Sequence, residues 1–210
     1  MKTLIQKSVL GLTLLAAVAG LSGCFPLLVG GAVTTVMVAS DRRTPGTVVE
    51  DNGIQLKANN RIDDSLGDRG HIDVTAYNRQ VLLTGEVPSE QDKQLVEKIV
   101  ANVENVRSVL NELAVMGNST LGQRSSDALV TSRVKANLVD AKDLYANAFK
   151  VTTERGTVYL MGRVTKREAD RATEVVTATS GVQKLVRILE IISEDELVRM
   201  MQQPSDAKAQ

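Results

Sequence analysis

The side chains that could carry acid–base or nucleophilic chemistry are few and isolated in this 210-residue sequence. His71 is the only histidine and Cys24 the only cysteine, which excludes a histidine-cluster or cysteine-cluster metal site and a disulfide framework. His71 has no serine or aspartate at a recognisable triad spacing, so we expect a structural histidine, on the surface or half-buried. The neighbouring carboxylates Asp63 and Asp64 are typical of a polar helix end. The sequence therefore predicts a protein that is not an enzyme, with no catalytic residues, no metal site and no cofactor.

Cys24 follows an N-terminal segment with the order of a secretory signal. Two lysines near the start precede an apolar run, and small residues separate that run from the cysteine. The run is shorter than the roughly 20 residues that cross a bilayer. Leu21-Ser22-Gly23-Cys24 resembles the lipobox of bacterial lipoproteins, which implies removal of residues 1–23 and a thioether link from Cys24 to diacylglycerol. The alternative is a buried apolar cysteine in a folded core.

The segment after the cysteine has no charged residue from Phe25 to Ser40. It is short and contains Pro26 and a Gly30-Gly31 pair, so it makes a poor membrane-spanning helix. We expect residues 24–46 to form an apolar tether on lipid or on a folded domain, and a flexible linker is the alternative. In the lipoprotein pattern an aspartate after the cysteine favours the inner membrane. Phe25 at that position therefore implies the outer membrane, facing the periplasm.

An internal repeat organises the rest of the chain. The strand-like run 81–87 matches 158–164, and 72–75 matches 149–152 at the same offset. Capping signals, amphipathic helical spacing and a final strand-like run then follow in both copies, at 106–115 and 182–192. Each copy also begins with a helical pattern of apolar residues four apart: Ile54, Ala58 and Ile62 in the first copy, and Val130, Val134 and Leu138 in the second.

These elements predict an α+β fold of two tandem αββαβ modules. We place the first module at residues 47–117 and the second module at residues 118–193, and we expect a frayed polar tail at 194–210. Tight turns are expected near Asn78-Arg79 and at 154–156. Whether the modules pack together is open at this point.

Two such units resemble BON domains. The resemblance rests on the strand ends Gly85-Glu86-Val87 and Gly162-Arg163-Val164, and on the starts of the last strands at Asn105-Val106 and Gly181-Val182. Asn105 departs from the usual glycine. A lipobox, an apolar tether and two BON domains together are similar to the dual-BON outer-membrane lipoproteins. That resemblance implies a non-enzymatic protein that binds anionic phospholipid through its second BON domain, supports envelope integrity and concentrates at the division site.

The net charge of zero divides unequally between the modules. The first module has seven basic and twelve acidic residues, a net charge of −5, and the second has twelve basic and eight acidic residues, a net charge of +4. A basic residue near anionic lipid contributes about 1 kcal/mol, so the second module is the one we expect at a membrane. Ordinary solvated charge and docking of one module on the other are the alternatives. The balance argues against binding of nucleic acid by bulk positive charge.

The first helix of the second module carries the candidate lipid-binding residues. Leu129 lies outside the apolar stripe, near Arg133 on the helical wheel, and Lys135 is also outside the stripe. An apolar residue among cations suits the headgroup boundary of a phosphatidylglycerol-like membrane. Arg163, Lys166 and Arg167 form an auxiliary basic run. The alternative is that Leu129 only widens the core stripe.

Two other functions fit the sequence less closely. The acidic first module could make the protein an adaptor for outer-membrane assembly, remodelling or division-site proteins. A haemolysin is the third hypothesis, but the sequence shows no amphipathic pore-forming helix.

Overall fold

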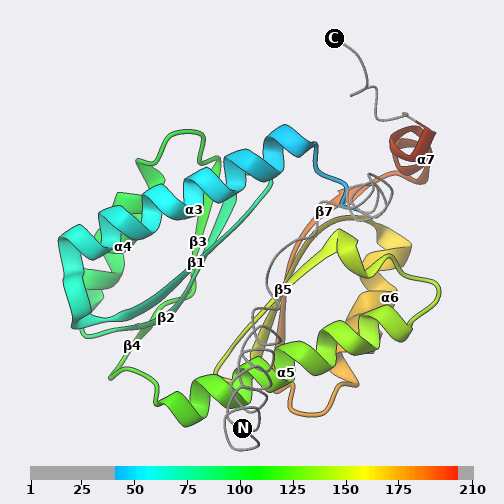
Figure 1. Ribbon diagram of the computed structural model, residues 1–210. Helices are drawn as coiled ribbons and strands as arrows, with labels where there is room; N and C mark the ends of the chain where they lie inside the picture. The colour runs from blue at the N-terminus through cyan, green and yellow to red at the C-terminus, as the bar shows by residue number, and fades with distance from the viewer. Residues whose placement is uncertain (1–40, 203–210) are drawn as a thin grey trace, which may run out of the picture. The chain divides into compact units, whose positions relative to one another are not determined.

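The computed structural model describes residues 41–202 (Figure 1). The expected signal peptide, Cys24, the tether before residue 41 and the end of the tail after residue 202 lie outside the described residues. No helix among residues 41–202 is long and apolar enough to cross a membrane.

The first module begins with a long helix whose start is set by local sequence. Thr44 caps the helix by accepting a hydrogen bond from the backbone of Thr47, and Pro45 fits the first helical turn. Ser89 caps the second helix in the same way through the backbone N–H of Asp92. The elements are α3 (Pro45–Leu66), the 3-10 helix η2 (Gly67–Arg69), β1 (His71–Tyr77), β2 (Gln80–Val87), α4 (Glu90–Ala101), β3 (Ser108–Asn111) and β4 (Ala114–Val115).

The second module repeats this order. Both of its long helices begin with a complete capping box, Thr120 with Gln123 and Thr165 with Glu168. The elements are α5 (Leu121–Asp140), the 3-10 helix η3 (Ala146–Ala148), β5 (Phe149–Glu154), β6 (Thr157–Thr165), α6 (Lys166–Thr177) and β7 (Lys184–Ile192). The predicted αββαβ order is therefore confirmed in both copies.

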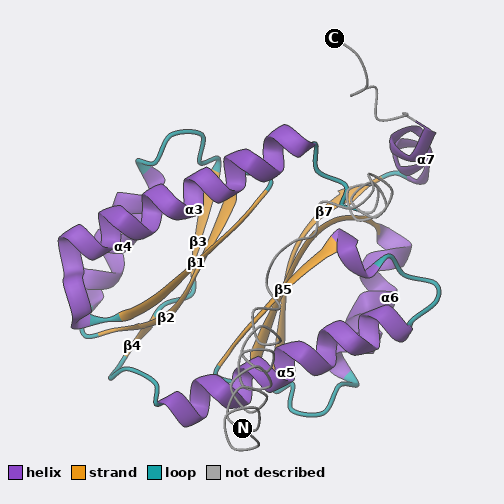
Figure 2. Cartoon of the chain, in the orientation of Figure 1, coloured by secondary structure: helices purple, strands orange, loops and turns teal. Residues whose placement is uncertain are grey.

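Each module contains a small mixed sheet (Figure 2). In both, an antiparallel hairpin is followed by a strand parallel to the hairpin's second strand: β1–β2–β3 and β5–β6–β7. The single last strand expected at 106–115 is divided into β3 and β4, which both pair with β2. Between them Leu113 turns into the core, and its N–H donates to the Asn111 side chain at 3.2 Å. The strand is interrupted because this buried leucine leaves the ladder.

In each module, a buried aspartate of the first helix accepts hydrogen bonds from the hairpin turn. Asn78, Arg79, Arg155 and Gly156 all have positive φ angles, from 48° to 69°, as the predicted tight turns require. The carboxylate of Asp51 accepts hydrogen bonds from the N–H groups of Asn78 and Arg79, both at 2.8 Å. Asp127 accepts from Arg155 at 2.8 Å and from Gly156 at 2.9 Å. These equivalent aspartates were not singled out from the sequence.

Each module has its own core between its two helices and its sheet (Figure 1). The predicted helix stripes are confirmed, because Ile54, Ala58 and Ile62 are buried in one core and Val130, Val134 and Leu138 in the other. Aliphatic residues dominate both cores, as the low aromatic content requires.

Gly85 and Gly162 lie inside β2 and β6 rather than at the strand ends, so that detail of the expectation is wrong. At both glycines the backbone of the neighbouring strand or turn approaches closely. A Cβ at Gly85 would lie 2.0 Å from the His71 carbonyl oxygen, and one at Gly162 would lie 2.6 Å from that of Ala148.

The segment after the second module is helical rather than frayed up to residue 202. Helix α7 (Glu194–Gln202) buries Leu197, and its Glu196 forms an ion pair with Arg163 at 2.6 Å. This contact and the buried leucine stabilise a segment whose polar composition suggested disorder.

Candidate functional site

The two modules pack through the sheet faces that their helices leave uncovered. A third apolar cluster joins Tyr77 and Leu82 of the first module to Tyr159, Met161 and Ile188 of the second. Because this packing buries the second face of β2 and β6, residues 81–83 and 158–161 form unbroken apolar runs instead of alternating with polar residues. Those runs were the sequence signal for the interface. In the sequence the same runs also mark the repeat.

The interface has a twofold-like arrangement of repeat-equivalent residues. Thr75 and its equivalent Thr152 face each other with their hydroxyl oxygens 3.5 Å apart. Leu82 and Tyr159, separated by the same interval in the sequence, both belong to the shared apolar cluster. Each residue at one end of the interface therefore has an equivalent at the other end.

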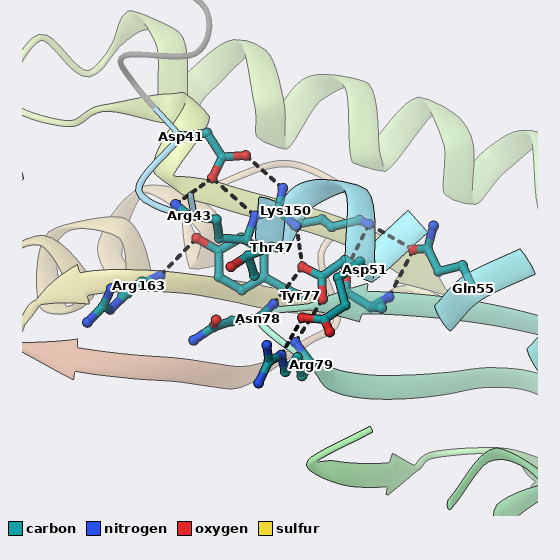
Figure 3. Close-up of polar contacts among 12 residues, drawn as sticks. Asp41, Arg43, Thr47, Asp51, Gln55, Tyr77, Asn78, Arg79, Lys150 and Arg163 are labelled. Atoms are coloured by element: carbon teal, nitrogen blue, oxygen red, sulfur yellow. Dashed lines mark hydrogen bonds and ion pairs between the residues drawn. The ribbon is translucent and has the colours of Figure 1, made fainter. Parts of the chain in front are cut away.

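The first end of the interface is the end that contains Tyr77. There the Tyr77 hydroxyl forms hydrogen bonds with the backbone of the second module. It donates to the carbonyl of Ala148 at 3.4 Å and accepts from the N–H of Arg163 at 3.2 Å (Figure 3). The Arg43 guanidinium lies 4.3 Å from the centre of the tyrosine ring. Burial, followed by the charge of Asp41, raises the pKa of Tyr77 to about 12, so the phenol is neutral and remains a donor.

Arginines of the segment before α3 hold it to both modules. Arg43 forms ion pairs with Asp41 and with buried Asp51, both at 2.7 Å (Figure 3). Arg42 makes a bidentate contact with Glu168 of the second module at 2.6 and 2.7 Å. The described end of the expected tether, which contains Arg42 and Arg43, is therefore held at the interface.

Lys150 adds a further contact at the first end. Its ammonium donates to the Gln55 side chain at 2.9 Å and to the carbonyl of Ala76 at 3.1 Å (Figure 3). Burial, together with the charge of Arg43, lowers the pKa of Lys150. Lys150 is therefore committed to the module interface and is not part of a lipid-facing basic surface.

The second end contains His71, Glu86 and Glu154. In the repeat they are the equivalents of Ala148, Arg163 and Tyr77 at the first end. His71 is half-buried, as expected from the sequence, and its Nδ1 lies 3.5 Å from Glu86 Oε2. Glu86 and Glu154 are both buried. Burial, then the charges of Glu86 and Asp127, raises the pKa of Glu154 to about 7, so this end of the interface concentrates negative charge.

The predicted lipid-binding residues of α5 are exposed but occupy two sides of the helix. Leu129 is 58% exposed and therefore does not widen the core stripe. Arg133 follows one helical turn later on the same side, next to the loop that contains Gly181. Lys135 lies on another side, where with exposed Val139 it borders a groove of about 450 Å³ whose lining includes Phe149.

The auxiliary basic run is separate from Leu129. Arg163 pairs with Glu190 at 3.2 Å and with Glu196, Lys166 pairs with Asp170 at 2.9 Å, and Arg167 lies 3.7 Å from Glu194. Arg163 lies near the end of β6, and Lys166 and Arg167 are the first residues of α6, whereas the loop beside Arg133 follows the end of that helix. The structure does not bring the two groups of cations together.

The BON domain family matches residues 50–117 and 126–192, which cover both repeats. The chain belongs to the BON domain family.

Three relatives are similar to this chain over most of its length. The chain is 33% identical to "Outer membrane lipoprotein DolP" of Haemophilus influenzae over 85% of its own length and 94% of that protein. It is 31% identical to the "21 kDa hemolysin" of Actinobacillus pleuropneumoniae, covering 72% of this chain and 79% of that protein. It is 28% identical to "Osmotically-inducible protein Y" of Escherichia coli, covering 70% and 76% respectively.

Proposed function

We propose that this BON-domain protein is an outer-membrane lipoprotein, anchored at Cys24 and facing the periplasm, whose second module binds anionic phospholipid and thereby supports envelope integrity, including at the division site. The similarity to the Haemophilus lipoprotein supports the anchor and the location. The exposure of Leu129 beside Arg133 on α5 is the observation that carries the lipid-binding part of the proposal.

The solvent-facing side of α5 suits the boundary between headgroups and acyl chains. The middle of this side carries the small residues Ser132 and Ala136. An apolar and a basic residue flank it on each edge: Leu129 with Arg133 on one, and Val139 with Lys135 on the other. Neither cation forms an ion pair with any residue in the described part of the chain. Uncommitted cations can approach lipid phosphates without first breaking a contact.

The equivalent helix of the first module is less suited to an anionic surface. Asp63 and Asp64 stand where α5 has Val139 and Asp140, and Lys57 is held by Glu104 at 3.0 Å. The excess negative charge of this module would also repel anionic lipid. The second module is therefore the one that we place against the membrane, and the paired cations around Arg163 would contribute less than Arg133 and Lys135.

Leu129→Asp is expected to weaken binding to phosphatidylglycerol vesicles at least about 10-fold, because it removes a leucine worth about 1.5–3 kcal/mol on burial and adds a repelled charge. Co-sedimentation of residues 41–210 measures this without the anchor and the apolar segment. Both modules must be present, because the second alone would expose the apolar face that includes Tyr159 and Met161.

The matched control is Leu56→Asp, which makes the same change at a 63% exposed leucine of α3. It is expected to leave vesicle binding unchanged. Equal binding to phosphatidylcholine vesicles, or full binding by Leu129→Asp, would contradict the proposal. Leakage of vesicle contents would instead favour the activity named for the Actinobacillus relative.

The proposed anchor is tested separately in cells. Cys24→Ala should move the protein from the outer-membrane fraction to the soluble periplasmic fraction, because one peripheral surface holds a protein less firmly than several acyl chains. Retention of this variant in the outer membrane after a salt wash would contradict lipidation as the anchor.

An adaptor for outer-membrane assembly or remodelling proteins is the second candidate function. Val49 and Leu56, 71% and 63% exposed, lie two helical turns apart on α3 of the acidic first module. This surface could receive an apolar and basic partner. A dominant crosslink from Leu56 to a partner protein, combined with unchanged vesicle binding of Leu129→Asp, would favour the adaptor.

A further inference from the structure

We propose that His71, Glu86 and Glu154 form a binding site for a divalent first-row transition-metal cation, with Zn²⁺ as its probe, and that the bound cation joins the two modules. The inference is independent of lipid binding. His71 and Glu86 belong to β1 and β2 of the first module, and Glu154 belongs to β5 of the second.

The three side chains are close enough to share one cation. A ligand atom from each, a histidine nitrogen and two carboxylate oxygens, lies within 4.8 Å of the others. Tetrahedral zinc with bonds of 2.0–2.2 Å has ligand atoms about 3.4 Å apart. The 3.5 Å between His71 Nδ1 and Glu86 Oε2 already matches that spacing. For tetrahedral binding, ligand atoms as far apart as 4.8 Å would have to move closer together.

Three buried polar atoms at this site lack hydrogen-bond partners among the described residues: His71 Nδ1, Glu86 Oε1 and Glu154 Oε1. Glu86 is fully buried and Glu154 is 6% exposed. Unsatisfied buried acceptors are rare because each loses its hydration without compensation. The same three side chains supply the potential ligand set, so a bound cation would compensate the buried imidazole nitrogen and both buried carboxylates.

The negative charges of Glu86 and Glu154 are not neutralised by a closely paired lysine or arginine of the described chain. Glu86 receives a hydrogen bond from the Ser119 N–H at 3.1 Å, but its nearest described cation is Arg155, 3.9 Å away. No Lys or Arg of the described chain is within 4 Å of the Glu154 carboxylate. Asp127 adds a further negative charge near Glu154. A divalent cation would offset this concentration of charge.

Comparison with the other end of the interface supports the same conclusion. There the Arg43 guanidinium lies over Tyr77, the equivalent of Glu154, and pairs with Asp51, the equivalent of Asp127. In the second repeat the position of Arg43 is taken by the uncharged Ser119. At the first end, the Arg43 guanidinium lies among the acidic side chains. The second end has acidic side chains but no arginine at the equivalent position.

The ligand set and the surroundings fit a transition metal better than calcium or magnesium. An imidazole nitrogen with two carboxylates suits Zn²⁺ and its neighbours, while Ca²⁺ and Mg²⁺ prefer oxygen ligands alone. Asp73 Oδ2 lies 3.8 Å from His71 Nε2, which adds a further negative charge beside the imidazole. A pocket of about 510 Å³ whose lining includes His71 and Glu154 gives the cation a route from solvent.

The proposal is tested by calorimetric titration with zinc. The full chain carries Cys24→Ala, which removes the only thiol, and is purified in detergent and stripped of metal with EDTA. We expect one equivalent of Zn²⁺ to bind. At about 100 times the Kd, zinc should raise the Tm by about 5–10 °C, since only the folded, paired modules present all three ligands. Calcium and magnesium should produce no comparable shift.

His71→Ala and Glu154→Gln are each expected to abolish the zinc-dependent rise in Tm. The control Glu90→Gln removes an exposed carboxylate of α4 and should keep it. Circular dichroism in EDTA shows whether each variant is folded. Absorption of the Co²⁺-loaded parent chain tests for mixed nitrogen and oxygen coordination without any substitution. No zinc binding by the parent chain, binding retained in both ligand variants, or an all-oxygen cobalt spectrum would overturn the proposal.

Discussion

Replacing Gly85 with alanine is expected to lower the free energy of unfolding by more than about 3 kcal/mol, among the largest effects of any single substitution in the chain. The backbone at Gly85 has a φ of +112°, which residues with a Cβ rarely adopt. The new Cβ would also lie 2.0 Å from the carbonyl oxygen and 2.9 Å from the carbonyl carbon of His71. Since this neighbour is backbone, only a shift of β1 against β2 could relieve the clash. Urea unfolding followed by circular dichroism measures the loss.

The matched control for this prediction is Gly53→Ala. Gly53 lies within α3, and nothing lies within 4 Å of the position its Cβ would take. Because alanine is the better helix former, this change should stabilise the protein by about 0.5–1 kcal/mol. The interpretation of Gly85 as a required close approach would be wrong if Gly85→Ala unfolded at the same urea concentration as the parent.

Asp51→Asn is expected to cost about 2–4 kcal/mol, because it removes one of the two carboxylates that pair with the largely buried Arg43 and leaves Asp41 alone to compensate its charge. Asp51 is 1% exposed, pairs with Arg43 at 2.7 Å and accepts two backbone hydrogen bonds from the β1–β2 turn. An asparagine side chain has one acceptor oxygen and cannot keep all three contacts. The change in urea midpoint at constant slope gives the loss of stability.

Asp127→Asn provides the internal comparison, since Asp127 supports the equivalent turn with no described arginine in ion-pair contact. Its expected cost is about 1–2 kcal/mol. In an Arg43→Met background the cost of Asp51→Asn should fall toward that of Asp127→Asn. Equal costs for the two asparagine substitutions in the parent chain would show that the Arg43 ion pair adds no stability.

The order of helices and strands could be predicted because each element has a local signature. Apolar residues four apart, such as Ile54, Ala58 and Ile62, identify a helix with one buried face, and Ser89 and Thr165 mark helix starts. The division of the last strand of the first module could not be predicted in this way. It depends on where the Leu113 side chain finds space in the core.

Packing of the two modules does not follow from the sequence, because it depends on which face of each sheet is covered. The uninterrupted apolar run Val81-Leu82-Leu83 indicates burial of both faces but does not identify the second covering layer. The ends of the interface were harder still. His71, Glu86 and Glu154 follow no motif spacing and meet only because the two sheets pack face to face. By contrast, the exposure of Leu129 could be derived from its position on a helical wheel.

The twofold-like pairing of the modules resembles an isologous homodimer fused into one polypeptide. In a true homodimer each interface residue occurs twice, so every substitution alters both ends together. Covalent fusion makes the pairing independent of protein concentration and lets each end change separately. Here one end has Tyr77 with Arg43, and the other has a histidine with two glutamates. A single surface has thereby acquired two chemically different ends, which two identical subunits could not have provided.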